Sequence, residues 1–285
     1  MCCFSMPVPY VAGTKIFARS LEDGRQALVY QMAFIAEEEL AMILPLPVPP
    51  GSPDDAVRFI DLAQYDTFFT DLERAFPAEL MVSRGYGAPL SMIQSKPKLI
   101  VHDVGEYEAS FVPSIADFDR LDDRFKLAPE TWAQLPRYAD WGFAVFKLRP
   151  VETQKKGFFA RLFGRKGRPG PRSVHPMAFE FPRREPDIVF FPTVHIHDGE
   201  VHETATFDHQ LYCQPGAALE ESIRWEPSDG PLEKWMKVSR AEGLIDPSAR
   251  VFRRTLNSIH RNEDQEVGRP VPPYTGPGPV PGPPA

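Results

Sequence analysis

The chain of 285 residues is long enough for one large domain or two ordinary ones, and 42% hydrophobic residues are ample for a core. The formal net charge of −7 argues against general nucleic-acid binding, which needs a broad positive surface. No apolar run reaches the roughly 18 residues of a membrane-spanning helix, and the N-terminus lacks the features of a secretory signal. We therefore expect a cytoplasmic protein, without a transmembrane segment, whose three cysteines are reduced thiols.

The first half of the chain predicts strands, then helices. Runs rich in β-branched and aromatic residues between turn residues predict strands at 15–19, 27–32, 43–49, 99–101 and 108–112. A helix is predicted from Ser52, which would cap it, with Val57, Ile60 and Leu62 at helical spacing. Further helices are expected at 66–76 and from Ser114 to Asp122.

The second half predicts strands at 142–148 and 177–181 as the two arms of a hairpin with an elongated tip. A strand at 188–197, its hairpin partner, and helices at 232–240 and 251–259 follow. The runs of strands are interrupted by helices without a regular βαβ alternation, which favours an α+β fold with a mostly antiparallel sheet and several short helices. We expect one main domain over 1–265 and a Pro/Gly-rich, disordered tail over 266–285.

The densest chemical signal is a group of three histidines around Asp198-Gly199. This dipeptide predicts a two-residue hairpin turn, because both positions tolerate positive φ. The register would set His197 opposite Glu200 and His195 opposite His202, with all four side chains on one face.

Imidazole and carboxylate are ligands that a divalent ion such as zinc prefers, so His195, His197 and His202, with Glu200 as fourth ligand or base, form a candidate metal site. The alternative is that these polar residues are the solvated face of a half-buried hairpin. His209 shares the apolar face of the next strand with Phe207 and is expected to be a core histidine.

A second set of features favours a non-catalytic interaction module. The segment 154–173 is rich in basic residues, contains no acidic residue, and includes three phenylalanines. Such a composition favours an anionic membrane surface or a protein partner, although its glycines and prolines also fit a solvated insertion. The Pro-rich tail would add a second contact segment.

Several segments, in order, resemble a bacterial family catalogued as domain of unknown function 2330. They are Cys2-Cys3, LVYQM at 28–32, ILPLPVP at 43–49, VGEYEA at 104–109 and the stretch from Tyr138 to Leu148. The resemblance covers about residues 1–190 and implies a shared fold but no activity. Such families typically look secreted, with cysteines just after a cleaved signal, whereas this chain starts directly at Met1-Cys2-Cys3.

Cys2 is the other candidate reactive residue. Removal of Met1 would leave its thiol beside a free α-amine, as in N-terminal nucleophile enzymes, where the amine acts as base. The stretch 16–22 resembles the second strand of cysteine-type N-terminal nucleophile amidohydrolases, and this resemblance places Arg19 near a substrate. The usual Asp is displaced to Glu22 or Asp23, and Cys2-Cys3 as ordinary buried residues is the alternative. If Cys2 lay near His195 or His202, the two candidates would form one Cys–His site.

Overall fold

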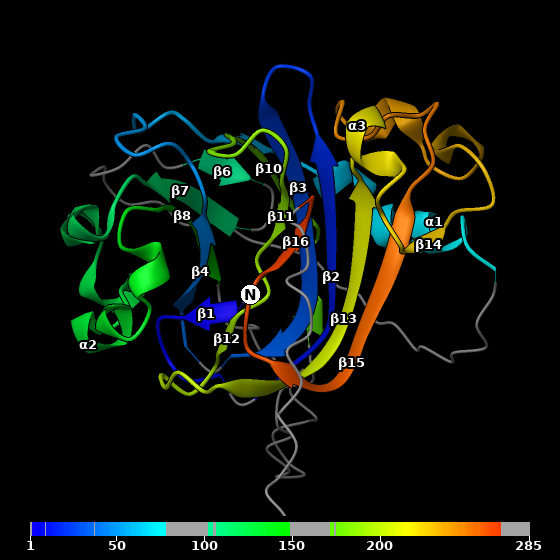
Figure 1. Cartoon of the computed structure of the whole chain (residues 1–285). Coiled ribbons are helices and arrows are strands. Elements are labelled where there is room, and N and C mark those ends of the chain that lie inside the picture. The colour runs from blue at the N-terminus through cyan, green and yellow to red at the C-terminus, as the bar shows by residue number, and fades with distance from the viewer. Residues whose placement is uncertain are drawn as a thin grey trace, which may run out of the picture.

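The computed structural model describes residues 2–8, 10–36, 38–77, 102–104, 107–148, 172–173 and 175–268. Two large sheets dominate the fold, and the helices are short (Figure 1). The α-helices are α1 (Phe68–Glu73), α2 (Pro129–Ala133) and α3 (Ala217–Glu220). Short 3₁₀ helices occur at Ala63–Tyr65, Ile115–Arg120, Asp123–Phe125, Pro136–Tyr138, Leu232–Lys234 and Val238–Arg240.

The six-stranded sheet holds the N-terminal strand in its interior. Its order is β12 (His195–Ile196), β1 (Cys2–Phe4), β4 (Leu40–Leu46), β8 (Gly142–Leu148), β7 (Tyr107–Val112) and β6 (His102–Val104). Strand β1 is antiparallel to β4 and parallel to β12. It is therefore hydrogen-bonded on both sides, and Cys3 and Phe4 are buried.

The eight-stranded sheet carries the longest strands. Its order is β14 (Glu226–Pro227), β15 (Phe252–Arg261), β13 (Thr204–Gln214), β2 (Tyr10–Ser20), β3 (Arg25–Ile35), β10 (Met177–Pro182) and β5 (Arg58–Ile60), with β9 (Arg172–Ser173) also on β3. A separate pair joins β11 (Val189–Phe191) to β16 (Gln265–Val267). Because β13 is parallel to β2, and β1 to β12, both large sheets are mixed; the α+β class is confirmed, but the expected mostly antiparallel sheet is not.

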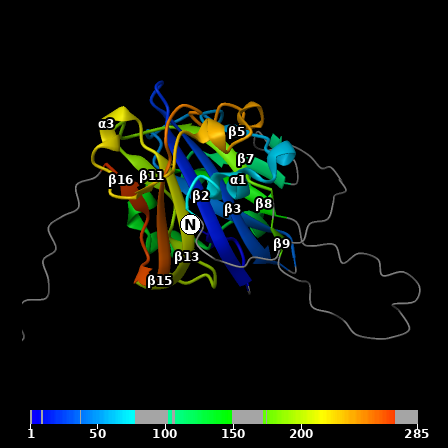
Figure 2. The ribbon, with the colours of Figure 1, turned by 90° about the vertical axis from the view of Figure 1, so that its right-hand side faces the viewer.

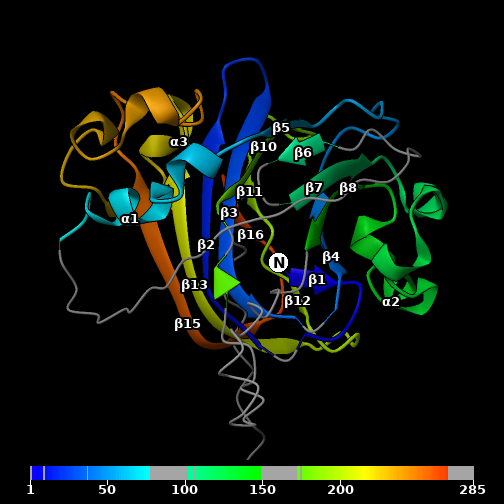
Figure 3. The same cartoon turned by 180° about the vertical axis from the view of Figure 1, so that it is seen from behind.

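Strand alternation buries the central strands β2, β3 and β10 of the eight-stranded sheet on both faces over much of their length, whereas β14 and most of β15 are exposed. Ile16 and Leu28 point into the larger core, which they share with residues of the six-stranded sheet. Their neighbours Phe17 and Val29 point the other way, into a second core with Phe68 of α1. Figure 2 shows α1 in front of β2 and β3, and Figure 3 shows α2 beside the six-stranded sheet on the opposite side of the molecule.

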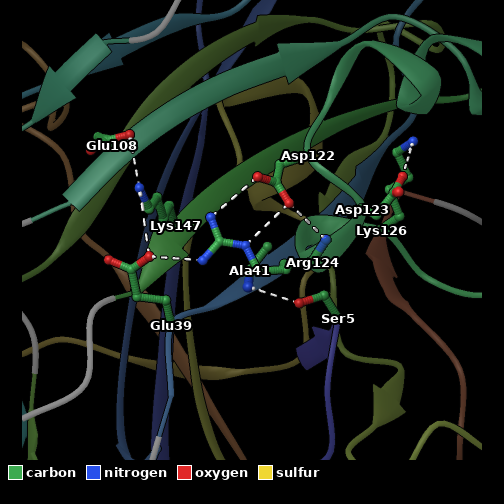
Figure 4. A network of polar contacts seen from close by, with 9 residues as sticks. All are labelled: Ser5, Glu39, Ala41, Glu108, Asp122, Asp123, Arg124, Lys126 and Lys147. Carbon is green, nitrogen blue, oxygen red and sulfur yellow. Dashed lines mark hydrogen bonds and ion pairs between the residues drawn. The ribbon is translucent and has the colours of Figure 1, made fainter. Parts of the chain in front are cut away.

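Polar contacts attach the end of β1 and a 3₁₀ helix to the six-stranded sheet (Figure 4). The Ala41 amide donates to Ser5 Oγ at 3.0 Å, and the Ser5 amide donates to the Ala41 carbonyl at 2.9 Å. Beyond them, Arg124 lies 3.6 Å from Glu39, and Lys147 lies 3.9 Å from the same carboxylate. These partly exposed ion pairs contribute little each to stability.

Three expectations are corrected by the strand pairing. The predicted helix from Ser52 is a turn followed by β5, in which Ile60 pairs with Ala178. The predicted helix at 251–259 is β15, which pairs with β13 over ten positions. The segments 142–148 and 177–181 are strands but lie in different sheets, so they do not form a hairpin. In each case long-range pairing overrides a local helical or hairpin pattern.

Candidate histidine site

The predicted His-rich hairpin does not form. Strand β12 ends at Ile196 and pairs with β1, and β13 begins only at Thr204 and pairs with β2 and β15. The turn itself exists: Gly199 has φ +87°, and the Glu200 amide donates to Asp198 Oδ1 at 3.0 Å. The residue opposite His195 is Cys2, not His202.

The backbone of β12 is held by side chains on the side away from β1. Asn262 Oδ1 accepts from the His195 amide at 2.7 Å, and Asn262 Nδ2 donates to the His195 and His202 carbonyls at 2.9 and 3.0 Å. The buried Asp264 carboxylate accepts from the Thr193 amide at 2.9 Å. These bonds fix the position of the backbone from which the His195 side chain extends.

Three imidazoles form a compact cluster, and one of them comes from a distant strand. The Nε2 atoms of His195 and His209 are 3.0 Å apart, and their rings stack with centroids 4.7 Å apart. His197 stacks on His195 at 4.9 Å. Phe207 packs against His195 at 4.4 Å and closes one side of the cluster. Sequence reasoning assigned His209 to the core, where it does lie, but missed its contact with His195.

Burial keeps these imidazoles neutral. Desolvation, with smaller contributions from neighbouring positive charge, lowers the pKa of His195 to about 2 and that of His197 to about 4. Desolvation also lowers the pKa of His209. Neutral imidazole has a free lone pair, the form that coordinates metals. A group with a pKa near 2 is, however, a poor general base at neutral pH.

Asp208 favours one tautomer of His209. Its Oδ1 lies 3.5 Å from His209 Nδ1, close enough for an ion pair with imidazolium but too far for an ordinary hydrogen bond with the neutral ring. A proton on Nδ1 faces this carboxylate favourably, and Nε2 then presents its lone pair toward His195. The shared contact at 3.0 Å is in that case a hydrogen bond donated by His195 Nε2.

A β-bulge in β2 completes the opposite wall. The register of β2 and β3 shifts between Ala12 and Lys15, Gly13 adopts φ +63°, and its amide donates to Asp208 Oδ2 at 2.6 Å. Thr14, fully buried, faces the same space as the histidines.

This space is a pocket of about 390 Å³ between β12 and the bulged end of β2 and β13. It is lined by Val11, Thr14, His195, His197, Asp198, His202, Thr204, Ala205, Thr206, Phe207, Asp208 and His209. Five buried side-chain polar atoms among the described residues have no hydrogen-bond partner, and three of them belong to this lining: Thr14 Oγ1, His197 Nε2 and His209 Nδ1. Such atoms are rare in folded proteins, and three of the five face this one pocket.

The other predicted site residues lie around or away from the cluster. His202 lies at the pocket rim, where its Nε2 is 2.8 Å from Asp198 Oδ2; this hydrogen bond raises the pKa of His202. Glu200 is exposed and is not part of the lining. Arg19 pairs with Gln214, four residues or about 13 Å along β2 from Lys15, and donates to the Gly243 carbonyl at 3.1 Å. The structure therefore separates Arg19 from the histidine pocket.

The roles expected for the basic insertion and the Pro-rich tail remain predictions. Most of the basic insertion 154–173 and the tail from 269 lie outside the described residues. In the described part of the chain, no helix has the length and apolar character needed to cross a membrane. Across the same residues, no three His, Cys, Asp or Glu side chains already converge as a metal site.

No family model and no curated protein matches the chain, so the resemblance to the family of unknown function also stays a prediction. Three solved structures are similar to it at low TM-scores. Baculovirus P35 is 13% identical, covering 91% of this chain and 96% of that chain, with a TM-score of 0.42. A mutated baculovirus P35 after caspase cleavage is 14% identical over 90% and 99%, with a TM-score of 0.42. The caspase-8/P35 complex contains a chain 12% identical over 90% and 96%, with a TM-score of 0.41.

Proposed function

We propose that this protein binds a divalent transition metal ion, with zinc as the first candidate, in the histidine pocket. His195 and His209 are the first two ligands and His197 is the third. This set revises the sequence-based hypothesis, because His209 takes the place of His202 and Glu200. The observation that carries the proposal is the approach of two neutral imidazole nitrogens to 3.0 Å inside a pocket with three unpartnered polar atoms.

The spacing of the two nitrogens fits a shared ion. Two ligands at 2.0 to 2.1 Å from a tetrahedral zinc lie about 3.3 Å apart, so an opening of a few tenths of an ångström would admit it. Asp208 Oδ1 lies 3.5 Å from His209 Nδ1, so it would have to approach by about half an ångström to make the carboxylate–histidine–metal hydrogen bond that orients ligating imidazoles. His197 would have to turn its ring to reach the ion, since the ring now stacks on His195. No hydrogen bond has to break for that turn, because His197 Nε2 has no partner among the described residues.

Negative charge must accompany a cation here, because the burial that excludes a proton from His195 also opposes a metal ion. Asp208 and Asp198 supply carboxylates in the lining. Cys2 occupies the position opposite His195, and its thiolate is proposed as the fourth ligand. A thiol nucleophile with His195 as its base is disfavoured by the low pKa of that imidazole.

The test measures metal affinity in protein purified without a His-tag, by competition with a chromophoric chelator at pH 7.5. We expect zinc to bind at one equivalent and His195→Asn and His209→Asn each to weaken binding by about 100-fold or more, since each removes a ligand. His202→Asn is the matched control from the pocket rim and should change affinity less than about threefold. Equal affinities in all four proteins, or less than a tenth of an equivalent bound, would refute the site.

Cobalt(II) substitution tests Cys2 separately. A thiolate ligand gives a sulfur-to-cobalt charge-transfer band, which Cys2→Ser would abolish while the ligand-field bands from the imidazoles remain. If the wild-type spectrum lacks that band, Cys2 is not a ligand and the metal is held by histidines alone.

A further inference from the structure

A second pocket shares no lining residue with the histidine pocket and has a different chemistry. It measures about 190 Å³, and its lining includes Pro47, Arg137, Trp141, Arg183, Arg184 and Ile188. Three guanidinium groups therefore meet an apolar wall in a protein whose net charge is −7. The volume is below the roughly 300 to 1,000 Å³ of pockets for drug-sized ligands, so only a small molecule would fit.

Two of the three arginines are already neutralised. Arg137 forms a short ion pair with Glu266 and lies 5.1 Å above the Trp141 ring. Arg184 Nη1 donates to both oxygens of Asp140 at 3.0 Å. These ion pairs hold the two guanidinium groups in place and already compensate their positive charge.

Arg183 has no such partner among the described residues. Its Nη1 donates to the Pro186 carbonyl and its Nη2 to the Leu21 carbonyl at 3.4 Å. Its Nε is buried without any hydrogen-bond partner, one of the two such atoms in the described chain that lie outside the histidine pocket. Burial lowers the pKa of Arg183, although the more distant Asp187 and Asp23 carboxylates partly offset this. A partly buried guanidinium whose described hydrogen bonds all go to carbonyls would be stabilised by an anion at close range.

We propose that this pocket binds a small monocarboxylate, with the carboxylate on Arg183 and a short apolar group against Pro47, Ile188 and Trp141. Arg183 is the arginine of this lining for which no close ion pair is described, and one such guanidinium matches one negative charge. Glu185 at the exposed rim and Glu266 in the lining oppose a dianion such as hydrogen phosphate. The apolar wall favours an organic acid over an inorganic anion.

The experiment uses ligand-observed NMR with the full-length protein and butyrate, benzoate, butyramide and inorganic phosphate as probes. We expect saturable binding of a carboxylate with a Kd on the order of 1 mM, as suits a ligand of few heavy atoms. The neutral butyramide and phosphate should each bind at least about tenfold more weakly. Tighter binding of phosphate than of both carboxylates would overturn the assignment.

Substitutions distinguish carboxylate binding in this pocket from nonspecific binding to exposed arginines. Arg183→Met should weaken carboxylate binding by about tenfold or more, whereas Arg224→Met, an exposed arginine bonded only to the Glu221 carbonyl, is the matched control and should have no effect. Ile188→Trp fills the cavity without changing charge and should also abolish binding, which covers the case in which Arg183→Met does not fold. Unchanged binding in Ile188→Trp, or equal loss in Arg224→Met, would refute the proposal.

Discussion

Acidification from pH 8 to pH 5 should destabilise the metal-free protein through its buried histidines. The folded-state pKa values of His195 and His197, about 2 and about 4, lie below the ordinary value of 6.5. The unfolded chain therefore binds more protons than the folded chain in this interval. Stability contributed by the neutral rings is complete above pH 6.5 and is lost as the pH falls toward the folded-state values.

The magnitude follows from the two pKa values of each ring. At pH 5 an unfolded histidine of pKa 6.5 gains about 2 kcal/mol from protonation, and a folded one of pKa 4 or lower gains almost nothing. Two rings give about 4 kcal/mol, or about 3 kcal/mol allowing for their residual solvent contact. That is a large part of the roughly 5 to 15 kcal/mol that holds a domain folded. Few carboxylates titrate in this range, so histidines dominate the change.

Urea unfolding in the presence of a chelator, followed by tryptophan fluorescence, measures this loss. The double variant His195→Asn/His197→Asn should lose the share of these two rings and keep that of His209, whose pKa burial also lowers; His197→Asn alone should lose about half as much as the double variant. His260→Asn is the control, because that side chain is exposed: its Nε2 contacts the Asn257 carbonyl at 3.0 Å, and its ring lies edge-on to Phe207 at the outside of the cluster. A change of less than about 1 kcal/mol in the unfolding free energy of the wild-type protein between pH 8 and pH 5 would refute this prediction, and so would the full pH dependence in the double variant.

Three further predictions concern single contacts. His202→Asn should remove a stabilisation of opposite pH dependence, present below pH 6.5 and lost as the pH rises, because Asp198 raises the pKa of His202; paired urea titrations at pH 5.5 and 8 check the sign. Gln26→Leu should cost about 2 to 5 kcal/mol in urea unfolding, since it orphans both Phe190 backbone groups, which Gln26 bonds at 2.7 and 2.9 Å. Gly142→Ala should lower the melting temperature, with a cost of about 1 to 3 kcal/mol, because the new Cβ would lie 2.5 Å from Phe111 Cε2.

Strands with strong local patterns could be predicted from the sequence, and elements defined by distant partners could not. The predicted strands at 15–19, 27–32 and 142–148 all lie within observed strands. The segment 251–259 has apolar residues that fit a helix equally well, and only its pairing with β13 decides for a strand. The pairing of β1 with β12 joins residues almost 200 positions apart, for which no local pattern exists.

The same limit applies to the candidate site: its local histidine motif can be predicted from the sequence, and its long-range contacts cannot. Three of the predicted ligands, His195, His197 and His202, line the histidine pocket, and the register of β1 places Cys2 opposite His195. That this pocket holds a metal stays a prediction. The partner His209 was missed because its alternation with Phe207 predicts a core position, and a core position on one strand says nothing about which strand faces it. Asp208 and the bulge at Gly13 depend on the same long-range pairing.

The unpartnered polar atoms in the histidine pocket lead to a last prediction. Removing one of them should stabilise the protein, whereas a substitution in an ordinary core should destabilise it. Thr14 is fully buried, and its Oγ1 has no hydrogen-bond partner within the described chain. Thr14→Val keeps the shape and removes the hydroxyl, so it should stabilise the metal-free protein by about 1 to 2 kcal/mol, the reverse of the usual effect of a core substitution. Chemical denaturation with a chelator measures the change, and Thr131→Val is the control for a buried threonine outside the pocket. If Thr14→Val is instead destabilising by more than about 1 kcal/mol, the hydroxyl is satisfied in solution and the pocket is better filled than its geometry implies. A stabilising result would mean that the folded protein tolerates polar atoms here at a cost to its own stability, as expected where those atoms serve a ligand.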